Sequence, residues 1–394
     1  MSEYPVITWT EAGENRSARW RSERGVPPPR RVVLADDVTA ADAAYRLASE
    51  GTALLWRGDF QNARQLLEAL GRRADRKSRK PRSAAASALT DSWAAGTSAE
   101  AFHLHRQAQS QRARTLGMVL VPLAADFSVP LKRAPDVREA CVEAYGPATE
   151  PSVVSLRELL GLIGAHEWRK KGVEIPAIGG RIHPHYGVVA PVRSEYVELV
   201  AGAPWPPSVH PGAPNLAFDI GTGTGVLAAV LARRGVARIV ATDQDPRALA
   251  CARENLERLG LAARVEVVQA DLFPEGRAPL VVCNPPWLPA RPSSPLERAV
   301  YDPGSRMLLG FLNGLPAHLE PGGEGWLVLS DLAEHLGLRS RGELLAAFDA
   351  AGLEVAGQVD TRPHHPRVSD TTDPLHAARS AEVTSLWRLK SGKQ

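Results

Sequence analysis

Residues 216–225 read Leu-Ala-Phe-Asp-Ile-Gly-Thr-Gly-Thr-Gly, and this stretch carries the strongest indication of the fold. Residues 216–220 are apolar apart from Asp219, which predicts a buried strand. The glycines that follow permit a tight turn and let a ligand approach the backbone closely. A helix is expected to begin at Gly225, and its first N–H groups favour a negatively charged ligand group. Alone, such a loop fits either a simple tight turn or a dinucleotide site.

The same alternation of strand and helix continues to the end of the chain. Apolar runs predict further strands at 238–242, 265–268, 280–283, 325–330, 353–359 and 383–389. Helices are predicted at 225–234 and at 246–259, where Pro246 stands in the first turn, a position that needs no backbone N–H. Strands that alternate with helices form a mostly parallel sheet covered on both faces. The second half of the chain is therefore predicted to be an α/β domain.

Two acidic residues follow the second and third of these strands. Asp243 comes 18 residues after Gly225 and is placed to accept hydrogen bonds from two ribose hydroxyls. Asp271 is placed to meet an adenine amino group, so that the pair fits an adenosine ligand. Each acid also has a purely structural alternative, in which it caps the next helix. Asp245 stands just before Pro246 and is better explained as such a cap.

The tetrad Asn284-Pro285-Pro286-Trp287 follows the fourth strand directly. Because ligands bind at the carboxyl ends of strands in such sheets, the tetrad is expected to face the same crevice as the glycine loop. The Asn284 side-chain oxygen and the Pro285 carbonyl together suit one planar NH₂ group. The Trp287 ring is expected to stack on the flat group that carries this nitrogen. A rigid turn with a packed tryptophan is the alternative.

The tetrad suits methyl transfer to nitrogen because an amide or aryl amine is a poor nucleophile. Two acceptors can draw its delocalised lone pair toward tetrahedral geometry, and stronger binding in the transition state raises the rate. In-line alignment with a sulfonium methyl group supplies the rest. No metal is required. The three cysteines, Cys141, Cys251 and Cys283, are too scattered for a zinc site or a disulfide framework.

These residues carry a family resemblance. The segment from about Arg181 to Leu338 resembles class I S-adenosylmethionine-dependent methyltransferases, in the amino-methylating branch with an Asn-Pro-Pro-aromatic motif. That branch includes protein-glutamine N5-methyltransferases of the HemK type, adenine-N6 methyltransferases and rRNA guanine-N2 methyltransferases. The resemblance implies a seven-stranded, mostly parallel Rossmann-like sheet and S-adenosyl-L-methionine as cofactor. It implies cofactor-binding roles for Arg193, Glu195, Asp219, Gly221, Thr222, Gly223, Gly225, Asp243, Asp271 and Asn284, and catalytic roles for Asn284, Pro285, Pro286 and Trp287.

The resemblance is strongest to the HemK type but is not complete. Residues 191–200 are similar to that family's Pro-Arg-x-x-Glu segment, and residues 301–304 and 321–323 are also similar to it. The family usually has Tyr where this chain has Trp287, which weakens a specific glutamine assignment. The N-terminal half does not resemble the helical bundle that recognises release factors. Residues 58–64 faintly resemble the degenerate N-terminal domain of the rRNA guanine-N2 enzymes.

The length of 394 residues fits two domains, and we expect a boundary between residues 175 and 176. Residues 1–175 are predicted to form a smaller α/β or α+β domain for substrate recognition, without a catalytic constellation. Its expected elements are strands at 52–56 and 118–121 and helices at 60–71, 103–116 and 153–171, with Gly71 as a C-cap. Five prolines in 202–214 exclude a helix or central strand there.

The net charge of +3 is the sum of a basic half and a slightly acidic one. Residues 1–200 contain 28 Lys/Arg and 23 Asp/Glu, whereas residues 201–394 contain 19 and 21. Much of the excess lies in 72–82, which has seven basic residues and one acid. Such a run attracts phosphate, although a solvated loop explains it equally well. Together with the Ala/Ser-rich residues that follow, it predicts a mobile segment over 72–101.

The sequence thus predicts an N-methyltransferase that acts on a macromolecule, either an rRNA base or a protein glutamine. A small-metabolite substrate and a non-catalytic cofactor-binding protein are the alternatives. No apolar stretch is long enough to span a membrane and no signal peptide is recognisable, so a cytoplasmic protein without membrane contact is expected. The residues around His183 and His185 can line the substrate mouth or be structural, and the polar segment 360–380 can cover the crevice. Oligomeric state is left open.

Overall fold

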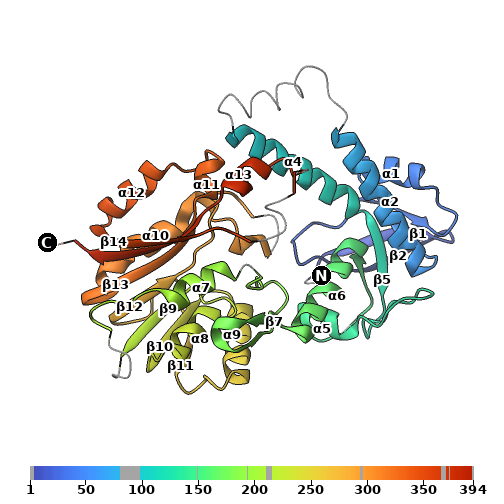
Figure 1. Ribbon diagram of the computed structural model, residues 1–394. Helices are drawn as coiled ribbons and strands as arrows, with labels where there is room; N and C mark the ends of the chain where they lie inside the picture. The colour runs from blue at the N-terminus through green and yellow to red at the C-terminus, as the bar shows by residue number, and fades with distance from the viewer. Residues whose placement is uncertain are drawn as a thin grey trace. The chain divides into compact units, whose positions relative to one another are not determined.

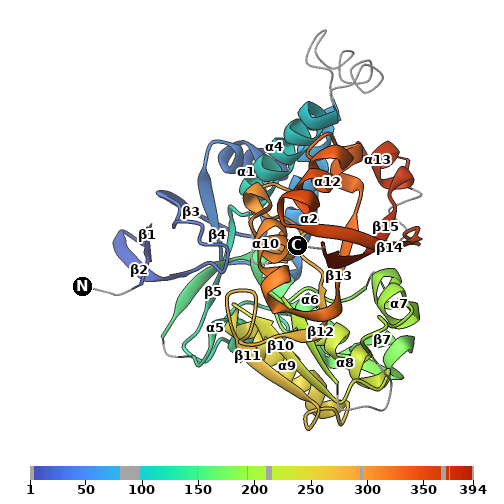
Figure 2. The ribbon, with the colours of Figure 1, turned by 90° about the vertical axis from the view of Figure 1, so that its left-hand side faces the viewer.

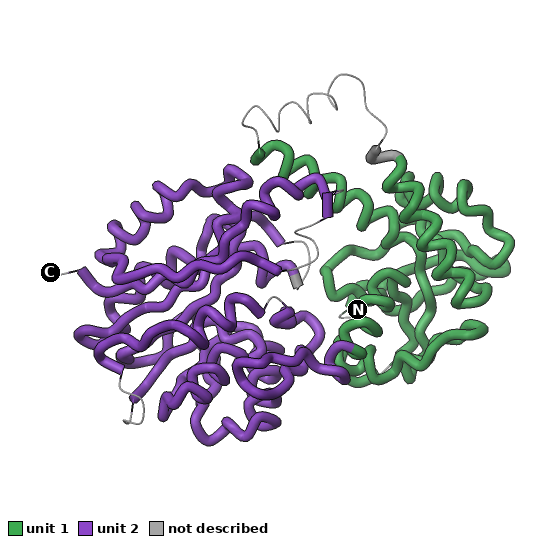
Figure 3. Tube along the Cα trace, viewed as in Figure 1, with its two compact units in different colours: residues 1–167 green, residues 168–394 purple. Residues whose placement is uncertain are grey.

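The chain folds into two compact units, residues 1–167 and 168–394, which Figure 3 distinguishes by colour. The structure is a computed structural model that describes residues 4–79, 98–148, 150–192, 194–209, 215–292, 296–364, 370–371 and 373–392, without the side chains of 77–79 and 296. The observed division falls eight residues before the boundary expected from the sequence, inside the helix α6 (Leu156–Lys171).

The first unit is built on a six-stranded mixed sheet in the order β1-β2-β6-β5-β4-β3. Its core consists of apolar side chains from these strands, such as Trp20, Leu55, Leu120 and Val153. The strands are β1 (Val6–Glu11), β2 (Glu14–Arg21), β3 (Arg31–Ala35), β4 (Thr52–Trp56), β5 (Val119–Leu123) and β6 (Ser152–Ser155). The helices are α1 (Ala41–Ser49), α2 (Phe60–Arg79), α4 (Ser98–Leu116), α5 (Arg138–Tyr145) and α6.

Two helix boundaries predicted in this unit were wrong. Helix α2 continues through Gly71, which is buried where α2 packs against α4, and a Cβ there would lie 3.2 Å from the Arg112 guanidinium. Glycine is therefore used at Gly71 for a close helix crossing and not for a C-cap. As a consequence, residues 72–79 of the basic run are helical and 98–101 begin α4, whereas 80–97 lie outside the described residues.

The helix predicted from residue 153 begins three residues later, at Leu156. Residues Ser152–Ser155 instead form the fully buried strand β6, which pairs with β2 on one side and β5 on the other. The β-branched Val153 and Val154 fit a strand that is covered on both faces. Sequence periodicity alone does not separate such a short buried strand from the first turn of a helix.

The second unit contains the seven-stranded sheet, in the order β11-β10-β9-β12-β13-β15-β14 (Figure 1). The pairs from β11 to β13 are parallel, and β15 runs antiparallel to both β13 and β14. The α/β class is as predicted. The strands are β9 (Leu216–Ile220), β10 (Arg238–Asp243), β11 (Val265–Gln269), β12 (Ala278–Cys283), β13 (Leu319–Ser330), β14 (Leu353–Thr361) and β15 (Thr384–Ser391).

Helices cover both faces of this sheet (Figures 1 and 2). One face packs against α7 (Glu195–Gly202), α8 (Val226–Arg233) and α9 (Pro246–Arg258), and the other against α10 (Arg306–His318) and α12 (Arg341–Ala350). The alternation of a strand decides which core a residue enters, so that Ala217 joins the first core and Phe218 the second. The shorter elements are β7 (Val173–Ile175), η1 (Pro176–Ile178), β8 (Gly180–Ile182), η2 (Leu296–Ala299), η3 (Pro303–Ser305), α11 (Leu332–His335) and α13 (His376–Ala381).

In the part of the chain that is described, no helix has both the length and the apolar character needed to cross a membrane. The predicted linker 202–214 begins at the end of α7, and its residues 210–214 lie outside the described residues. The polar segment 360–380 is described only in part and includes the start of α13.

Candidate functional site

The glycine loop and the Asn-Pro-Pro-Trp tetrad follow adjacent strands of the second sheet. Strand β9 lies between β10 and β12 and is parallel to both, with Ile220 opposite Thr242 on one side and Cys283 on the other. The residues after these strands therefore emerge at the same, carboxyl, edge. The structure thus brings the loop 221–225, Asp243 and the tetrad 284–287 to one edge, as the sequence predicts.

Asp219 is a buried carboxylate under the glycine loop. It is 1% exposed, and one of its oxygens accepts hydrogen bonds from the Thr222 hydroxyl (2.6 Å) and from the Ala228 N–H (3.0 Å) at the start of α8. Burial raises the pKa of Asp219 to about 6, and the nearby Asp243 carboxylate adds to this effect. Asp219 therefore shapes the loop from below and ties it to the helix.

The glycines of the loop have left-handed backbones, with φ of 72° at Gly221, 55° at Gly223 and 81° at Gly225. Only glycine adopts this region without strain. A Cβ at Gly221 would lie 2.4 Å from the Met307 methyl group, and one at Gly225 would lie 3.3 Å from the Cα of Ala252. Gly221 and Gly225 therefore let the loop pack closely against α10 and α9, whereas the position of a Cβ at Gly223 is open space.

Asp243 ends β10 with both of its oxygens turned toward backbone N–H groups. One oxygen accepts from Gly223 at 3.0 Å and the other from Asp245 at 3.0 Å. Burial raises the pKa of this carboxyl above its ordinary value, because the charged form loses solvation. Asp245 is the N-cap of α9 and accepts from the Arg247 N–H at 2.9 Å, which agrees with the separate role predicted for it.

Asp271 lies just beyond the end of β11 and is exposed. It forms an ion pair with Arg306 at 3.0 Å and accepts a hydrogen bond from the Gln244 side chain. Gln244 follows Asp243 in sequence, so Asp271 does lie at the same edge as Asp243. Its contact with an adenine amino group stays a prediction.

The tetrad begins immediately after the buried Cys283, and Asn284 is half-buried. The Asn284 Oδ1 accepts a hydrogen bond from the Trp287 indole N–H at 2.9 Å. The first and last residues of the Asn-Pro-Pro-Trp tetrad are therefore hydrogen-bonded to each other, and the indole fixes the orientation of the carboxamide. An amide oxygen has two lone pairs, so Oδ1 keeps the capacity to accept a second hydrogen bond.

A buried aspartate that was not predicted organises the chain beyond the tetrad. Asp302 is 5% exposed and accepts from the N–H groups of Met307 (2.9 Å) and Leu308 (3.2 Å) in the first turn of α10. Its own N–H donates to the Leu288 carbonyl at 2.8 Å. Asp302 thus joins the tetrad segment to the helix whose Met307 reaches Gly221. The only sequence signal was the HemK-like stretch 301–304, to which no role was given.

Glu195, which is predicted to help hold the cofactor, is a buried acid. It is the first residue of α7, is 7% exposed, and its Oε1 has no hydrogen-bond partner among the described residues. The neighbouring Tyr196 is half-buried; loss of solvation raises the pKa of its hydroxyl, and the charge of Asp219 adds to this effect. An unpartnered buried carboxylate oxygen is costly, and it is available to a cationic ligand group. Arg193, predicted alongside it, lies outside the described residues.

Asn255, a residue that sequence reasoning missed, supports the loop from α9. It is fully buried, donates to the carbonyl of Thr224 (3.1 Å), and accepts from the His183 N–H (2.8 Å). His183 Nδ1 lies 2.6 Å from the Arg169 carbonyl, and His185 Nε2 lies 2.6 Å from Glu254. These contacts give the two histidines the structural role that was one of their two predicted alternatives.

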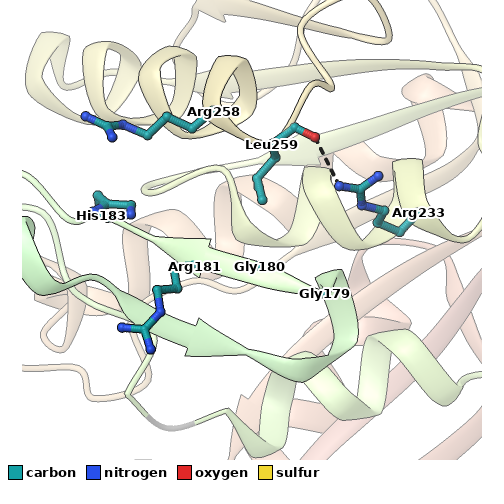
Figure 4. Close-up of a pocket in the computed structure, with 7 residues that line it drawn as sticks. All are labelled: Gly179, Gly180, Arg181, His183, Arg233, Arg258 and Leu259. Carbon is teal, nitrogen blue, oxygen red and sulfur yellow. Dashed lines mark hydrogen bonds between the residues drawn. The ribbon is translucent and has the colours of Figure 1, made fainter.

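A shallow pocket lies at the other end of α8 from the glycine loop (Figure 4). It is lined by the β7–β8 hairpin and by the last residues of α8 and α9. Arg233 points to Leu259 and donates to its carbonyl at 3.0 Å. Because α8 begins at the loop and ends at this pocket, the pocket is separate from the carboxyl edge. Within the described ranges, no cluster of three or more potential metal ligands occurs.

Residues 211–350 match the family model of the methyltransferase small domain. The chain is 38% identical over 149 residues to a ribosomal protein L11 methyltransferase from Pelotomaculum thermopropionicum, covering 37% of this chain and 40% of the relative. It is 36% identical over 151 residues to a release factor glutamine methyltransferase from Cereibacter sphaeroides, covering 34% and 51%. The chain thus spans about half or less of the length of these relatives.

Among solved structures, the chain is similar to an S-adenosylmethionine-dependent methyltransferase from Thiobacillus denitrificans in complex with S-adenosyl-L-homocysteine. The identity is 15%, the TM-score is 0.37, and the match covers 52% of this chain and 94% of that one.

Proposed function

We propose that this protein is an S-adenosylmethionine-dependent methyltransferase that modifies a planar side-chain amide nitrogen of a protein. The observation that carries the proposal is the position of Asn284. This residue follows the carboxyl end of β12, and β12 pairs with β9, the strand that leads into the glycine loop. The match of residues 211–350 to a methyltransferase domain supports it. The name of the release factor glutamine methyltransferase supports the choice of a protein amide, and that of the ribosomal protein L11 methyltransferase supports a protein substrate.

The residues at the carboxyl edge fit the cofactor. The open space at Gly223 leaves the loop backbone there free to approach the methionine part, and the unpartnered Glu195 Oε1 suits its ammonium group. The carboxylate of Asp243 keeps acceptor capacity beyond its contacts with backbone N–H groups, which suits ribose hydroxyls. Asp271 would receive the adenine amino group, and Thr222 and Asp219 hold the loop in shape. Arg193 is kept in the proposed set on its sequence match.

In the reaction, the cofactor supplies an electrophilic methyl group on a sulfonium centre. The Asn284 Oδ1 and the Pro285 carbonyl accept the two N–H groups of the substrate and hold its nitrogen in line. Their pull on the two protons increases as the nitrogen loses its planar delocalisation, so the contacts are strongest in the transition state. The indole N–H of Trp287 keeps Oδ1 in place, and Pro286 stiffens the turn.

RNA is a second candidate substrate, and an observation in the first unit favours it. Helix α2 exposes Arg64, Arg72 and Arg76, whereas Arg73 and Arg112 are paired with Asp42 and Asp75. Exposed arginines attract phosphate. We propose that residues 1–167 select the substrate in either case, and that the protein acts in the cytoplasm.

The test is incubation of the purified protein and methyl-labelled S-adenosylmethionine with extract from a strain that lacks the gene. The extract is then separated into RNA, protein and small molecules. We expect label in protein that is released as methylamine by acid hydrolysis, because an N-methyl amide yields this amine. Label in RNA bases would establish the second candidate, and label in small molecules would point to a metabolite. A reaction without label in any fraction would contradict methyltransferase activity.

A further inference from the structure

Arg339 lies next to the tetrad but was not among the predicted site residues. It stands between α11 and α12, just before the Ser340 N-cap of α12. Its Nη2 donates to the main-chain carbonyl of Trp287 at 3.4 Å, a long hydrogen bond. Its own N–H reaches the Ala333 carbonyl at 3.3 Å. The guanidinium is therefore held beside the residue that carries the indole.

No described carboxylate of residues 168–394 forms an ion pair with this guanidinium. Every aspartate and glutamate of residues 168–394 lies in the described part of the chain, and none forms an ion pair with Arg339. The acids whose charges act on it are engaged elsewhere. Glu334 pairs with Arg341 at 2.8 Å, Asp302 accepts from Met307 at 2.9 Å, and Glu343 accepts from Ser340 at 2.6 Å.

Arg339 is half-buried, and one nitrogen of its guanidinium is out of contact with water. Its Nε is buried and has no acceptor among the residues described, and burial lowers the pKa of Arg339. A guanidinium has five N–H donors, and the single long contact to Trp287 uses one. If Arg339 served only to hold the tetrad backbone, one long hydrogen bond would not offset the free-energy cost of a buried donor without an acceptor. Nε is enclosed, but the Nη groups keep N–H donors beyond the one that contacts Trp287, and an oxygen supplied by a ligand can accept from these.

We propose that Arg339 is a substrate-binding residue that donates hydrogen bonds to a main-chain carbonyl oxygen of the polypeptide whose side-chain amide is held by Asn284. This inference rests on the proposed function, since it takes the substrate to be a protein. The main chain of a glutamine lies only a few bonds from its amide nitrogen, and Arg339 contacts the tetrad itself. The planar fork of an arginine suits such carbonyl oxygens, and a charged donor makes the stronger kind of hydrogen bond.

The experiment compares two amides as ligands of the full-length protein saturated with S-adenosylhomocysteine. N-acetylglutamine N-methylamide has the side-chain amide and two main-chain carbonyls, whereas butyramide has the side-chain amide alone. We expect the wild type to bind the first about tenfold more tightly, as for a hydrogen bond to a charged donor. In Arg339→Met this ratio falls to about one, while butyramide affinity is kept, since the charged donor alone is lost. Arg339→Lys restores part of the ratio.

The matched control is Arg298→Met, which removes the same charge from an exposed position on η2 and should keep the wild-type ratio. An unchanged ratio in Arg339→Met would overturn the inference. So would an equal loss of both ligands, which is the result of a purely structural role, and so would a wild type that does not distinguish them. These results are separate from the extract assay, which tests the proposed function through the fraction that is labelled. Binding of a single-stranded RNA that depends on Arg339, without a ratio between the amides, would overturn the peptide contact in favour of a phosphate.

Discussion

Replacement of Asp243 by Asn should weaken cofactor binding strongly, although the two side chains are nearly the same size. Both carboxylate oxygens of Asp243 accept backbone N–H groups, from Gly223 and Asp245, at 3.0 Å each. An asparagine has one oxygen and must turn its NH₂ group toward one of these donors. Because that NH₂ group also cannot accept from a hydroxyl, the variant should lose at least one of the proposed hydrogen bonds from the ribose to a charged acceptor, about 1.5–3 kcal/mol, or roughly a 10- to 150-fold loss of affinity.

Isothermal titration calorimetry with S-adenosylhomocysteine measures this effect without turnover. The matched control is Asp245→Asn, which removes the same charge two residues away and leaves an N-cap that asparagine fills equally well. Methylthioadenosine, which keeps the ribose and lacks the amino acid, should lose the same factor in Asp243→Asn. Similar affinities of the two variants, or a loss limited to S-adenosylhomocysteine, would refute the assignment of Asp243 to the ribose.

Three further predictions concern the support of the loop. The pKa of Asp219 is about 6 in the folded protein and 3.8 ordinarily, so the folded state holds a proton that the unfolded state has lost, and the free energy of unfolding falls by roughly 3 kcal/mol as pH rises from 4 to 6. Urea unfolding of Asp219→Asn should lack this dependence on pH. The same dependence in the variant and the wild type would contradict the buried charge. Gly225→Ala should lower both cofactor affinity and stability, because the new Cβ meets Ala252. Gly260→Ala, at a similar φ of 70° and with open space around the Cβ, should lower stability alone. Calorimetry that finds the same loss of cofactor affinity in both variants would contradict this prediction. Asn255→Leu leaves the Thr224 carbonyl unpaired at a cost of about 1–3 kcal/mol, and should raise the KM for the cofactor with kcat nearly unchanged; a fall in kcat alone would argue against this role.

Much of the candidate site could be predicted because its residues follow strands directly. The glycine loop, Asp243 and Asn284 each come within a few residues of a strand end, and parallel neighbours place such residues at one edge. Asn255, Asp302 and Arg339 could not be found in this way. Each lies on a helix or in a loop with no local pattern. Asn255 and Arg339 contact residues more than 30 positions away in the sequence. Asp302 acts through a turn at the start of α10 that tertiary packing forms.

The fold was predictable where the spacing of apolar residues fitted only a helix or only a strand. The alternation from β9 to β15 was recognised, since long helices separate its first strands. The first unit was harder. The β1–β2 hairpin was not predicted: β2 is polar and largely exposed over its first half, so the short apolar run of β1 had no recognisable apolar partner beside it. Gly71 also shows that a glycine near a helix end can mark a close crossing, which is a property of two helices and not of one.

The most direct test of the central claim is the methyl transfer activity of Asn284→Ala on the extract fraction that the wild-type protein labels, measured beside its affinity for S-adenosylhomocysteine. Asn284 is proposed to act on the acceptor nitrogen, so transfer should fall by about a hundredfold or more, as for the loss of one transition-state hydrogen-bonding group. The affinity should stay within about twofold, because the loop and Asp243 are untouched. Transfer at the wild-type rate, with the protein folded and the cofactor bound, would contradict the account.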